Sequence, residues 1–281
     1  MHFCATLKFE DMKNLILLLI TIILITASEK LFSQTILPSD KFDNVSLQLF
    51  DSEVLNETRR IFIYVPFENS ENLSYPVLYI LDGEMTDQYG EALNCVQTNK
   101  EVGPHIIVGI ETVENRNRDM IPVKMVSRPE AGGADKFLQF LVSELQPYID
   151  SNFKTTGESI LYGASTAGLF PVYAMLEHSD SFFGYISSST MIGHCPEYMK
   201  NKVFNFKPKS QMKGTYLYIH YGMKDQFKQV VDYLPDYYEF LKEQFGDNLI
   251  SGLKGLQDKG HVPAGGIEEG LSFIYKNKKA Q

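Results

Sequence analysis

Cysteine and histidine are scarce in this 281-residue chain, which contains three cysteines and six histidines. Cys4 lies in the N-terminal segment, so only Cys95 and Cys195 remain; one disulfide in an oxidising compartment and two free thiols are equally compatible with the sequence. No C-x-x-C or H-E-x-x-H motif occurs, and the histidines are scattered. Because metal ligands usually cluster at characteristic spacings, the sequence predicts no metal site, and it indicates no cofactor.

Long runs of one charge are also missing. The 35 acidic and 26 basic residues give a net charge of −9 and are distributed along the chain. A nucleic-acid partner is therefore excluded as a working hypothesis, because such proteins need basic patches that neutralise phosphates. A hydrophobic content of 44% supports a packed core, and no repeat or Pro/Gly-rich linker divides the chain. We expect a small-molecule partner; the sequence leaves the oligomeric state open.

The N-terminal segment contains the longest apolar run, residues 15–26, which follows Lys13. At about 12 residues this run is shorter than the ~20 that a membrane-spanning helix needs, and its position fits a signal peptide. We therefore expect residues 1–34 to be a leader with its true start at Met12, and an exported, periplasmic or extracellular mature chain beginning near Thr35. An uncleaved membrane anchor stays an alternative, because no clear A-x-A cleavage site follows.

From residue 35 onward, short β-branched and aromatic runs alternate with longer amphipathic stretches, which is typical of an α/β sheet. The strands are predicted at residues 46–50, 59–65, 76–81, 105–110, 159–162, 184–187, 215–221 and 249–256. Helices are predicted at residues 86–96, 134–151, 166–178, 227–245 and 264–276. The pattern predicts one domain over residues 35–281, with an eight-stranded, mostly parallel sheet flanked by helices and no large cap domain.

One short motif carries chemistry. Residues 163–168 read Gly-Ala-Ser-Thr-Ala-Gly, directly after a predicted strand and at the start of a predicted helix. This is the setting of a nucleophile elbow, a strained turn that exposes a serine above the sheet and requires small residues two positions before and after it. Gly163 and Ala167 meet that requirement, so Ser165 is the candidate nucleophile. The structural alternative is a serine that caps a helix.

A serine nucleophile needs a histidine base and an orienting carboxylate, which follow it in the order Ser, Asp/Glu, His in α/β-hydrolases. His261 is the candidate base, because it lies in a loop after the last strand. His194 comes too early, and His220 alternates within a strand. Asp225 follows the seventh strand and is the candidate acid. Its rival Asp232 is expected within the next helix.

Four segments in order along the chain resemble the esterase family that includes esterase D and the enterochelin esterase-like hydrolases. They are YPVLYILDG at 75–83, VGI at 108–110 with RNRDMIP at 116–122, the elbow, and GHVP at 260–263 with GLSF at 270–273. The resemblance implies an α/β-hydrolase fold and a triad of Ser165, Asp225 and His261. It further implies an oxyanion hole made by the backbone N–H groups of Thr166 and Glu84.

Some positions depart from the family pattern. Ala167 stands where the family commonly has glycine, and Pro171 within the helix predicts a kink or a displaced helix start. The aromatic pair expected after the sixth strand is absent, so no substrate preference is carried over. Arg116 and Arg118, in the long connection over residues 111–133, are candidate contacts for an anionic or polyol substrate, although an ordinary loop salt bridge is the simpler interpretation.

The sequence thus predicts a serine esterase that passes an acyl group from Ser165 to water. Two alternatives stay open, namely an acyltransferase of the same fold and a non-catalytic ligand-binding relative that has kept the fold.

Overall fold

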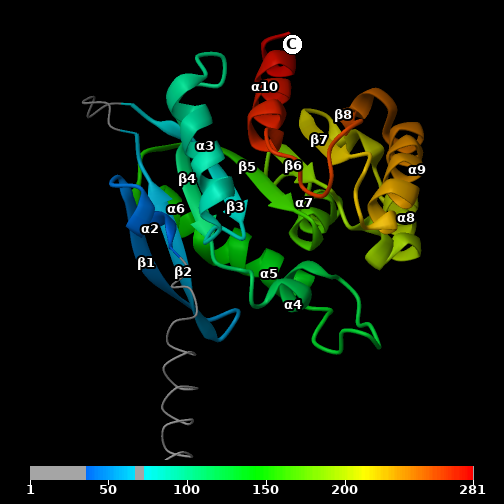
Figure 1. Cartoon of the computed structure of the whole chain (residues 1–281), viewed down its shortest axis with the longest axis horizontal. Coiled ribbons are helices and arrows are strands. Elements are labelled where there is room, and N and C mark those ends of the chain that lie inside the picture. Colours follow the sequence, from blue (N-terminus) through cyan, green and yellow to red (C-terminus); the bar gives the residue numbers. More distant parts are fainter. Residues whose placement is uncertain (1–35, 67–72, 281) are drawn as a thin grey trace, which may run out of the picture. The chain divides into compact units, whose positions relative to one another are not determined.

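An eight-stranded sheet, in the order β1-β2-β4-β3-β5-β6-β7-β8, organises the protein (Figure 1). The computed structural model describes residues 36–66 and 73–280, so the predicted leader lies outside the described residues. The strands are β1 (Val45–Ser52), β2 (Glu57–Tyr64), β3 (Tyr75–Leu81), β4 (Ile106–Ile110), β5 (Thr155–Ala164), β6 (Gly184–Ser188), β7 (Thr215–Gly222) and β8 (Leu249–Leu256). All eight predicted strands are confirmed.

Strand direction divides the sheet into two parts. β1 and β2 form an antiparallel hairpin, and β2 also runs antiparallel to β4. From β4 to β8 every neighbouring pair is parallel. Ala164, Ser188 and His220 occupy matching positions on β5, β6 and β7. The loops that follow these strands therefore meet at one edge, the carboxyl end of the sheet, where α/β enzymes assemble their sites.

Helices cover both faces of the sheet. They are α2 (Pro38–Lys41), α3 (Thr86–Thr98), α4 (Arg116–Met120), α5 (Ala134–Phe140), α6 (Gln146–Asn152), α7 (Thr166–Glu177), α8 (Pro196–Asn205), α9 (Lys228–Phe245) and α10 (Gly266–Lys279). Buried side chains of α3 and α10 join the core on one face, whereas those of α5, α7, α8 and α9 join the core on the other. The predicted α/β class with a mostly parallel sheet is confirmed.

The helices differ from the prediction in two respects. The single helix predicted over residues 134–151 consists of α5 and α6 with one π-helical turn, Leu141–Leu145, between them. Three further helices, α2, α4 and α8, were not predicted. Each helix is short and buries few side chains; α8, for example, buries only Met199 and Val203. The apolar residues therefore recur too few times to reveal a helical period in the sequence.

The two cysteines among the described residues, Cys95 and Cys195, are on opposite faces of the sheet. Cys95 packs in the core beneath α3 and Cys195 in the core beneath α9, and both are free thiols. The sequence leaves open a disulfide or two free thiols, and the described structure has two free thiols. Within the described residues, no helix combines the length and apolar character needed to cross a membrane.

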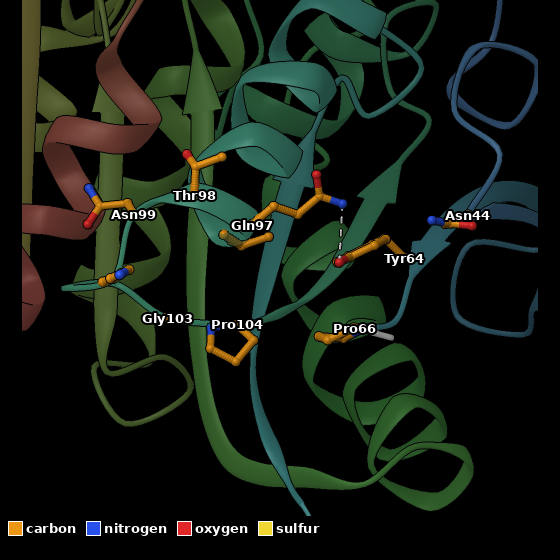
Figure 2. Close-up of a pocket in the computed structure, with 10 residues that line it drawn as sticks. Asn44, Tyr64, Pro66, Gln97, Thr98, Asn99, Gly103 and Pro104 are labelled. Carbon is orange, nitrogen blue, oxygen red and sulfur yellow. Dashed lines mark hydrogen bonds between the residues drawn. The ribbon is translucent and has the colours of Figure 1, made fainter. Parts of the chain in front are cut away.

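The amino end of the parallel strands contains a pocket of about 490 Å³ (Figure 2). It lies between the end of β2, the end of α3 and the turn before β4, and Gln97 there donates a hydrogen bond to the Tyr64 hydroxyl at 3.3 Å. Its lining residues are Asn44, Tyr64, Pro66, Val96, Gln97, Thr98, Asn99, Lys100, Gly103 and Pro104. Because these residues lie at the end of the sheet away from Ser165, the pocket is separate from the predicted site.

Candidate active site

Ser165 occupies a strained turn between β5 and α7. Its φ of 59° and ψ of −124° lie outside the regions that a residue with a side chain normally adopts. Three backbone hydrogen bonds hold the turn: the Ser165 N–H donates to the Ser188 carbonyl at 2.8 Å, and the Ser165 carbonyl accepts from Gly168 and Met191 at 3.0 and 3.2 Å. The surrounding strand and helix thus offset the cost of exposing the hydroxyl.

Close backbone contacts explain why the elbow needs small residues. A Cβ added to Gly163 would lie 2.2 Å from the Ala167 carbonyl oxygen, and one added to Gly168 would lie 2.8 Å from the Ser188 carbonyl oxygen. The methyl group of Ala167 is fully buried at the position where the family commonly has glycine. The elbow therefore tolerates this departure from the family pattern.

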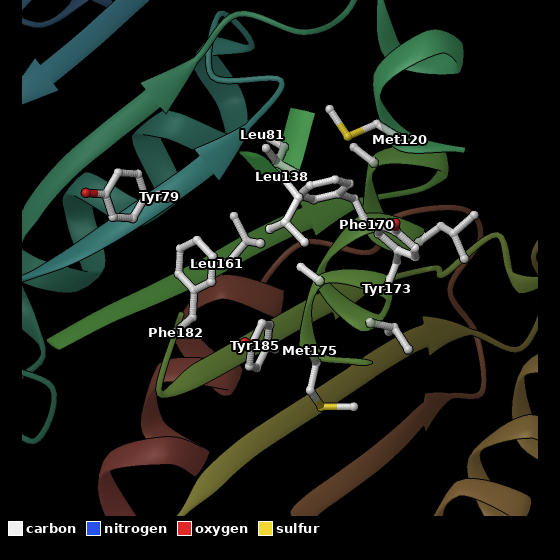
Figure 3. Packing of buried hydrophobic residues seen from close by; sticks show 14 of the residues in the cluster. Tyr79, Leu81, Met120, Leu138, Leu161, Phe170, Tyr173, Met175, Phe182 and Tyr185 are labelled. Atoms are coloured by element: carbon white, nitrogen blue, oxygen red, sulfur yellow. The ribbon is translucent and has the colours of Figure 1, made fainter. Parts of the chain in front are cut away.

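Helix α7 anchors the nucleophile in the core. Its residues from Thr166 to Leu176 are all buried, and Figure 3 shows Phe170 and Tyr173 packed beside Leu138 and Leu161. Pro171 lies inside the helix, which begins at Thr166 and continues to Glu177. The predicted displacement of the helix start is wrong, because packing on all sides outweighs the single hydrogen bond that a proline cannot donate.

His261 lies in the loop between β8 and α10, as predicted. Its Nε2 is 2.8 Å from Ser165 Oγ, within hydrogen-bond distance. The next residue, Val262, has a φ of 48°, and its N–H donates to the Ser189 hydroxyl at 3.0 Å. Ser189 itself has a φ of 46°. Two strained residues from different loops thus fix the imidazole above the serine.

The end of the same loop is fixed by α3. The Glu91 carboxylate accepts hydrogen bonds from the N–H groups of Gly265 and Ile267, at 3.0 and 2.8 Å, at the start of α10. A carboxylate at a helix N-terminus satisfies otherwise unpaired N–H groups and interacts favourably with the helix dipole. Sequence reasoning missed Glu91, since its partners lie more than 170 positions away.

Asp225 lies in the turn after β7, and its Oδ2 is 2.7 Å from His261 Nδ1. Its other carboxylate oxygen accepts a hydrogen bond from the Phe227 N–H at 2.9 Å, and its side chain is fully buried. Asp232 is exposed on α9, which begins at Lys228. Asp258 is paired with Lys224. The structure therefore brings Asp225, and neither rival, to the histidine.

Two other histidines lie near this end of the sheet. His194 Nε2 contacts Thr166 Oγ1 at 3.2 Å, and the ring is buried. His220 is buried on β7, and neither ring nitrogen has a hydrogen-bond partner among the described residues. Burial lowers the pKa of each to about 4, so both rings stay neutral near pH 7.

The two predicted oxyanion donors differ in their surroundings. Among the described residues the Thr166 N–H, at the first position of α7, makes no hydrogen bond. Glu84 follows β3, next to β5 in the sheet, and its buried carboxyl group accepts hydrogen bonds from Thr112 and Val113 at 3.2 and 2.9 Å. Burial raises the pKa of Glu84, whereas a hydrogen bond from its own backbone N–H opposes the rise.

The structure places both candidate arginines in ion pairs. Arg116 pairs with Asp82, its Nη2 lying 2.7 Å from a carboxylate whose pKa is raised by burial and lowered by this arginine. Arg118 bridges Glu57 and Asp119, at 2.6 and 2.7 Å, towards the β1-β2 hairpin. Arg116 therefore adjoins the loop after β3, the strand that lies beside β5 in the sheet.

Exposed apolar side chains lie in the loops that follow β3 and β7. Met85 follows the Glu84 turn, and Met223 and Phe227 flank Asp225; all three are at least 40% exposed. The Phe227 ring packs edge-on against His261, with 4.6 Å between ring centroids. This apolar rim, Met85, Met223 and Phe227, offers a surface to an apolar part of a ligand.

The arrangement has the groups that acyl transfer requires. A serine hydroxyl contacts a histidine, the histidine contacts a buried carboxylate, and an unpaired helix N–H follows the serine. Such a set can deprotonate the hydroxyl during attack on a carbonyl carbon and stabilise the resulting oxyanion.

Comparison with known proteins identifies the family of this chain. Residues 52–248 match the protein-family model described as "Putative esterase". The ferri-bacillibactin esterase BesA of Bacillus subtilis (strain 168) is 31% identical over 185 residues, which cover 57% of this chain and 63% of that protein. The siderophore triacetylfusarinine C esterase of Aspergillus fumigatus is 27% identical over 183 residues, covering 59% and 63%. The matches thus span less than two thirds of these relatives.

Solved structures share the fold. The IroE-like serine hydrolase from Shewanella oneidensis superposes with a TM-score of 0.74 at 24% identity, covering 83% of this chain and 80% of that one. The siderophore hydrolase EstA from Aspergillus nidulans gives a TM-score of 0.68 at 17% identity, with 83% and 95% covered.

Proposed function

The chain belongs to this esterase family, and we propose that it is a hydrolase that cleaves a carboxylic ester through Ser165. The observation that carries the proposal is the continuous hydrogen-bonded path from Ser165 through His261 to Asp225, with contacts of 2.8 and 2.7 Å. A serine held in a left-handed turn at a strand-helix junction has little structural purpose unless its hydroxyl is used.

In the proposed mechanism, His261 Nε2 takes the proton of Ser165 Oγ as the oxygen attacks the ester carbon. The imidazolium is stabilised and oriented by Asp225. Collapse of the tetrahedral intermediate transfers the proton to the leaving alcohol and leaves an acyl group on Ser165. Water, deprotonated by His261, then releases the acid. The backbone N–H groups of Thr166 and Glu84 stabilise the oxyanion.

The first test compares two serine variants on a p-nitrophenyl ester. Ser165→Ala should lower kcat by about 10⁶ because triad members act as a unit, and it adds no bulk to the turn. Ser143→Ala, which changes an exposed serine on the π-turn, should keep full activity. A fluorophosphonate adduct located on Ser165 by mass spectrometry would complete the test, and an adduct on another serine would contradict the proposal.

We further propose a siderophore ester as the substrate. The relatives above are named as esterases of ferri-bacillibactin and triacetylfusarinine C. The apolar rim beside His261 supports a bulky substrate more than a short acyl ester. Purified protein should therefore cleave these two siderophores with a higher kcat/KM than acetylated sugars or feruloyl esters. A preference for either of the latter would argue against this assignment, and formation of a new ester with an added alcohol would indicate an acyltransferase.

Export is also a proposal, supported by the apolar run at residues 15–26. N-terminal sequencing of protein recovered from native cells should find a mature chain that begins near Thr35. Recovery of the intact segment in the membrane fraction would favour an anchor instead.

A further inference from the structure

Arg128 differs from the other arginines of this protein in its contacts. Four of the five arginines, Arg59, Arg60, Arg116 and Arg118, contact carboxylates. Arg128 makes no ion pair among the described residues. Its guanidinium instead lies 3.2 Å from Nδ1 of the buried His194, and a turn closed by its N–H to the Met125 carbonyl, at 3.1 Å, holds it there. The charged Arg128 guanidinium thus orients the neutral His194 ring.

This contact fixes which nitrogen of His194 carries the proton. A guanidinium can only donate, so Nδ1 must accept and the proton must be on Nε2. Nε2 lies 3.2 Å from Thr166 Oγ1 and therefore donates to it. The two hydrogen bonds run in one direction, from Arg128 through His194 to Thr166.

The third step concerns the Thr166 hydroxyl. Because its oxygen accepts from His194, its own proton must point to another acceptor, and the described residues provide none. Thr166 is 9% exposed, so bulk water reaches this hydroxyl poorly. The residue directly follows Ser165, at the first position of α7, where its backbone N–H is also unpaired.

We propose that Arg128 and His194 are positioning residues that turn the Thr166 hydroxyl towards the substrate, as a side-chain donor to the oxyanion formed at Ser165. The Thr166 N–H and O–H would then bind one oxygen together. This inference rests on the proposed ester hydrolysis. It also gives the site a second donor on the residue that follows the nucleophile.

The direction of the hydrogen bonds can be measured without any substrate. In ¹⁵N NMR spectra of the whole protein, His194 should show a protonated Nε2 and an unprotonated Nδ1 from pH 6 to 8, with the signals assigned by their loss in His194→Gln. Arg128→Met should allow a mixture of the two tautomers. A wild-type His194 with its proton on Nδ1, or doubly protonated at pH 7, would overturn the proposal.

Kinetics on a p-nitrophenyl ester tests the hydroxyl. Thr166→Val keeps the shape and backbone N–H but removes the donor, and should lower kcat by about 10² with little change in KM, as expected for a group that acts on the transition state. Thr166→Ser should stay within about threefold of wild type, since the donor remains. Arg128→Met should lose about threefold to tenfold, whereas Lys124→Met, an exposed change on the same loop, should lose nothing.

The outcomes separate the two proposals. A wild-type protein inactive on every ester would overturn ester hydrolysis and this inference with it. Full wild-type activity with equal rates for Thr166→Val and Thr166→Ser would overturn the inference alone. Circular dichroism melting curves establish that each variant is folded.

Discussion

The two ends of the parallel sheet both contain backbone in the left-handed region, but the carboxyl end also places several residues with side chains there. At the amino end, Gly103, Gly157 and Gly214 have positive φ angles, and a Cβ added to any of them would meet no atom within 4 Å. At the carboxyl end positive φ angles occur at Gly132 and Gly265 and also at four residues with side chains, Asp82, Ser165, Ser189 and Val262. Glycine adopts this region without strain, whereas other residues need support from their surroundings. Strain is thus concentrated around Ser165.

His105 at the amino end and His261 at the carboxyl end differ in their surroundings in a way that matters for proton transfer. At the amino end His105 is fully buried, its Nδ1 donating to the Gly103 carbonyl at 3.0 Å and its Nε2 accepting from the Tyr275 hydroxyl at 2.6 Å. At the carboxyl end the side chain of His261 is 20% exposed and lies between a hydroxyl and a carboxylate. A pocket of about 490 Å³ reaches Gly103 and Pro104 next to His105, yet the groups suited to proton transfer are beside His261.

The largest loss of activity should come from changing Asp225, the carboxylate that contacts His261. Asp225→Asn preserves shape but removes the charge that stabilises the imidazolium, and the analogous change in a serine protease lowers kcat by about 10⁴. We expect a loss of that order in kcat on a p-nitrophenyl ester. Asp232→Asn, on the exposed side of α9, is the matched control and should stay within about twofold. Near-full activity of Asp225→Asn would remove Asp225 from the proposed triad.

A second comparison uses two neighbouring glycines at the carboxyl end. A Cβ on Gly222 would lie 2.0 Å from the Gly260 carbonyl oxygen, so Gly222→Ala must displace the loop that carries His261. We expect kcat/KM to fall by about 10², since a displacement of ~1 Å can cost that much, and stability to fall by about 1–3 kcal/mol.

Gly260→Ala is the control for this change. Its Cβ would meet no atom closer than 3.9 Å, at the Lys224 carbonyl oxygen, so activity and urea unfolding should stay near wild type. Equal effects of the two substitutions would show that the close approach at Gly222 does not position His261.

Much of the carboxyl end could be predicted from the sequence because its key signals are local. The motif at residues 163–168, with a predicted strand before it and a predicted helix after it, identifies Ser165. Chain order and loop position then select His261, and the end of the seventh strand selects Asp225. The structure brings these three side chains together, and the family match confirms the resemblance to known esterases. Their catalytic roles stay predictions.

The supports of the site could not be predicted, because their partners are distant in sequence. Glu91 binds the start of α10, Ser189 binds the Val262 N–H, and Arg128 reaches His194 across the fold. None of these pairs follows a periodic pattern or a motif. Sequence periodicity reports which side chains are buried, whereas single long-range hydrogen bonds leave no repeated signal.

A third prediction concerns pH and the amino end. Burial lowers the pKa of His105 to about 4, from an ordinary value near 6.5. Between these values the unfolded chain binds a proton that the folded protein does not, so the contribution of His105 to stability is lost as the pH falls. His105→Gln removes this titration. The difference in unfolding free energy between wild type and variant should shrink by up to about 2 kcal/mol from pH 6.5 to pH 5.

Urea unfolding at the two pH values measures this change, and esterase activity at pH 7 supplies the comparison with His261. We expect His105→Gln to keep kcat/KM within about twofold, while His261→Gln loses activity by several orders of magnitude. A pH-independent difference in stability would mean that His105 titrates normally in the folded protein.

The smallest effect is expected in the amino-end pocket. Gln97→Met removes the hydrogen bond from the exposed Gln97 to the hydroxyl of Tyr64, which lines the pocket. Because one neutral hydrogen bond contributes about 1 kcal/mol net, stability should fall by about that amount or less. The pocket has no nucleophile paired with a base and lies at the far end of the strands from Ser165, so kcat/KM for both aryl and siderophore esters should stay within about twofold. The measurement is steady-state hydrolysis of a p-nitrophenyl ester and of ferri-bacillibactin. A tenfold fall with the siderophore alone would mean that a bulky substrate reaches this end of the sheet, and the division between a reactive carboxyl end and an inert amino end would no longer hold.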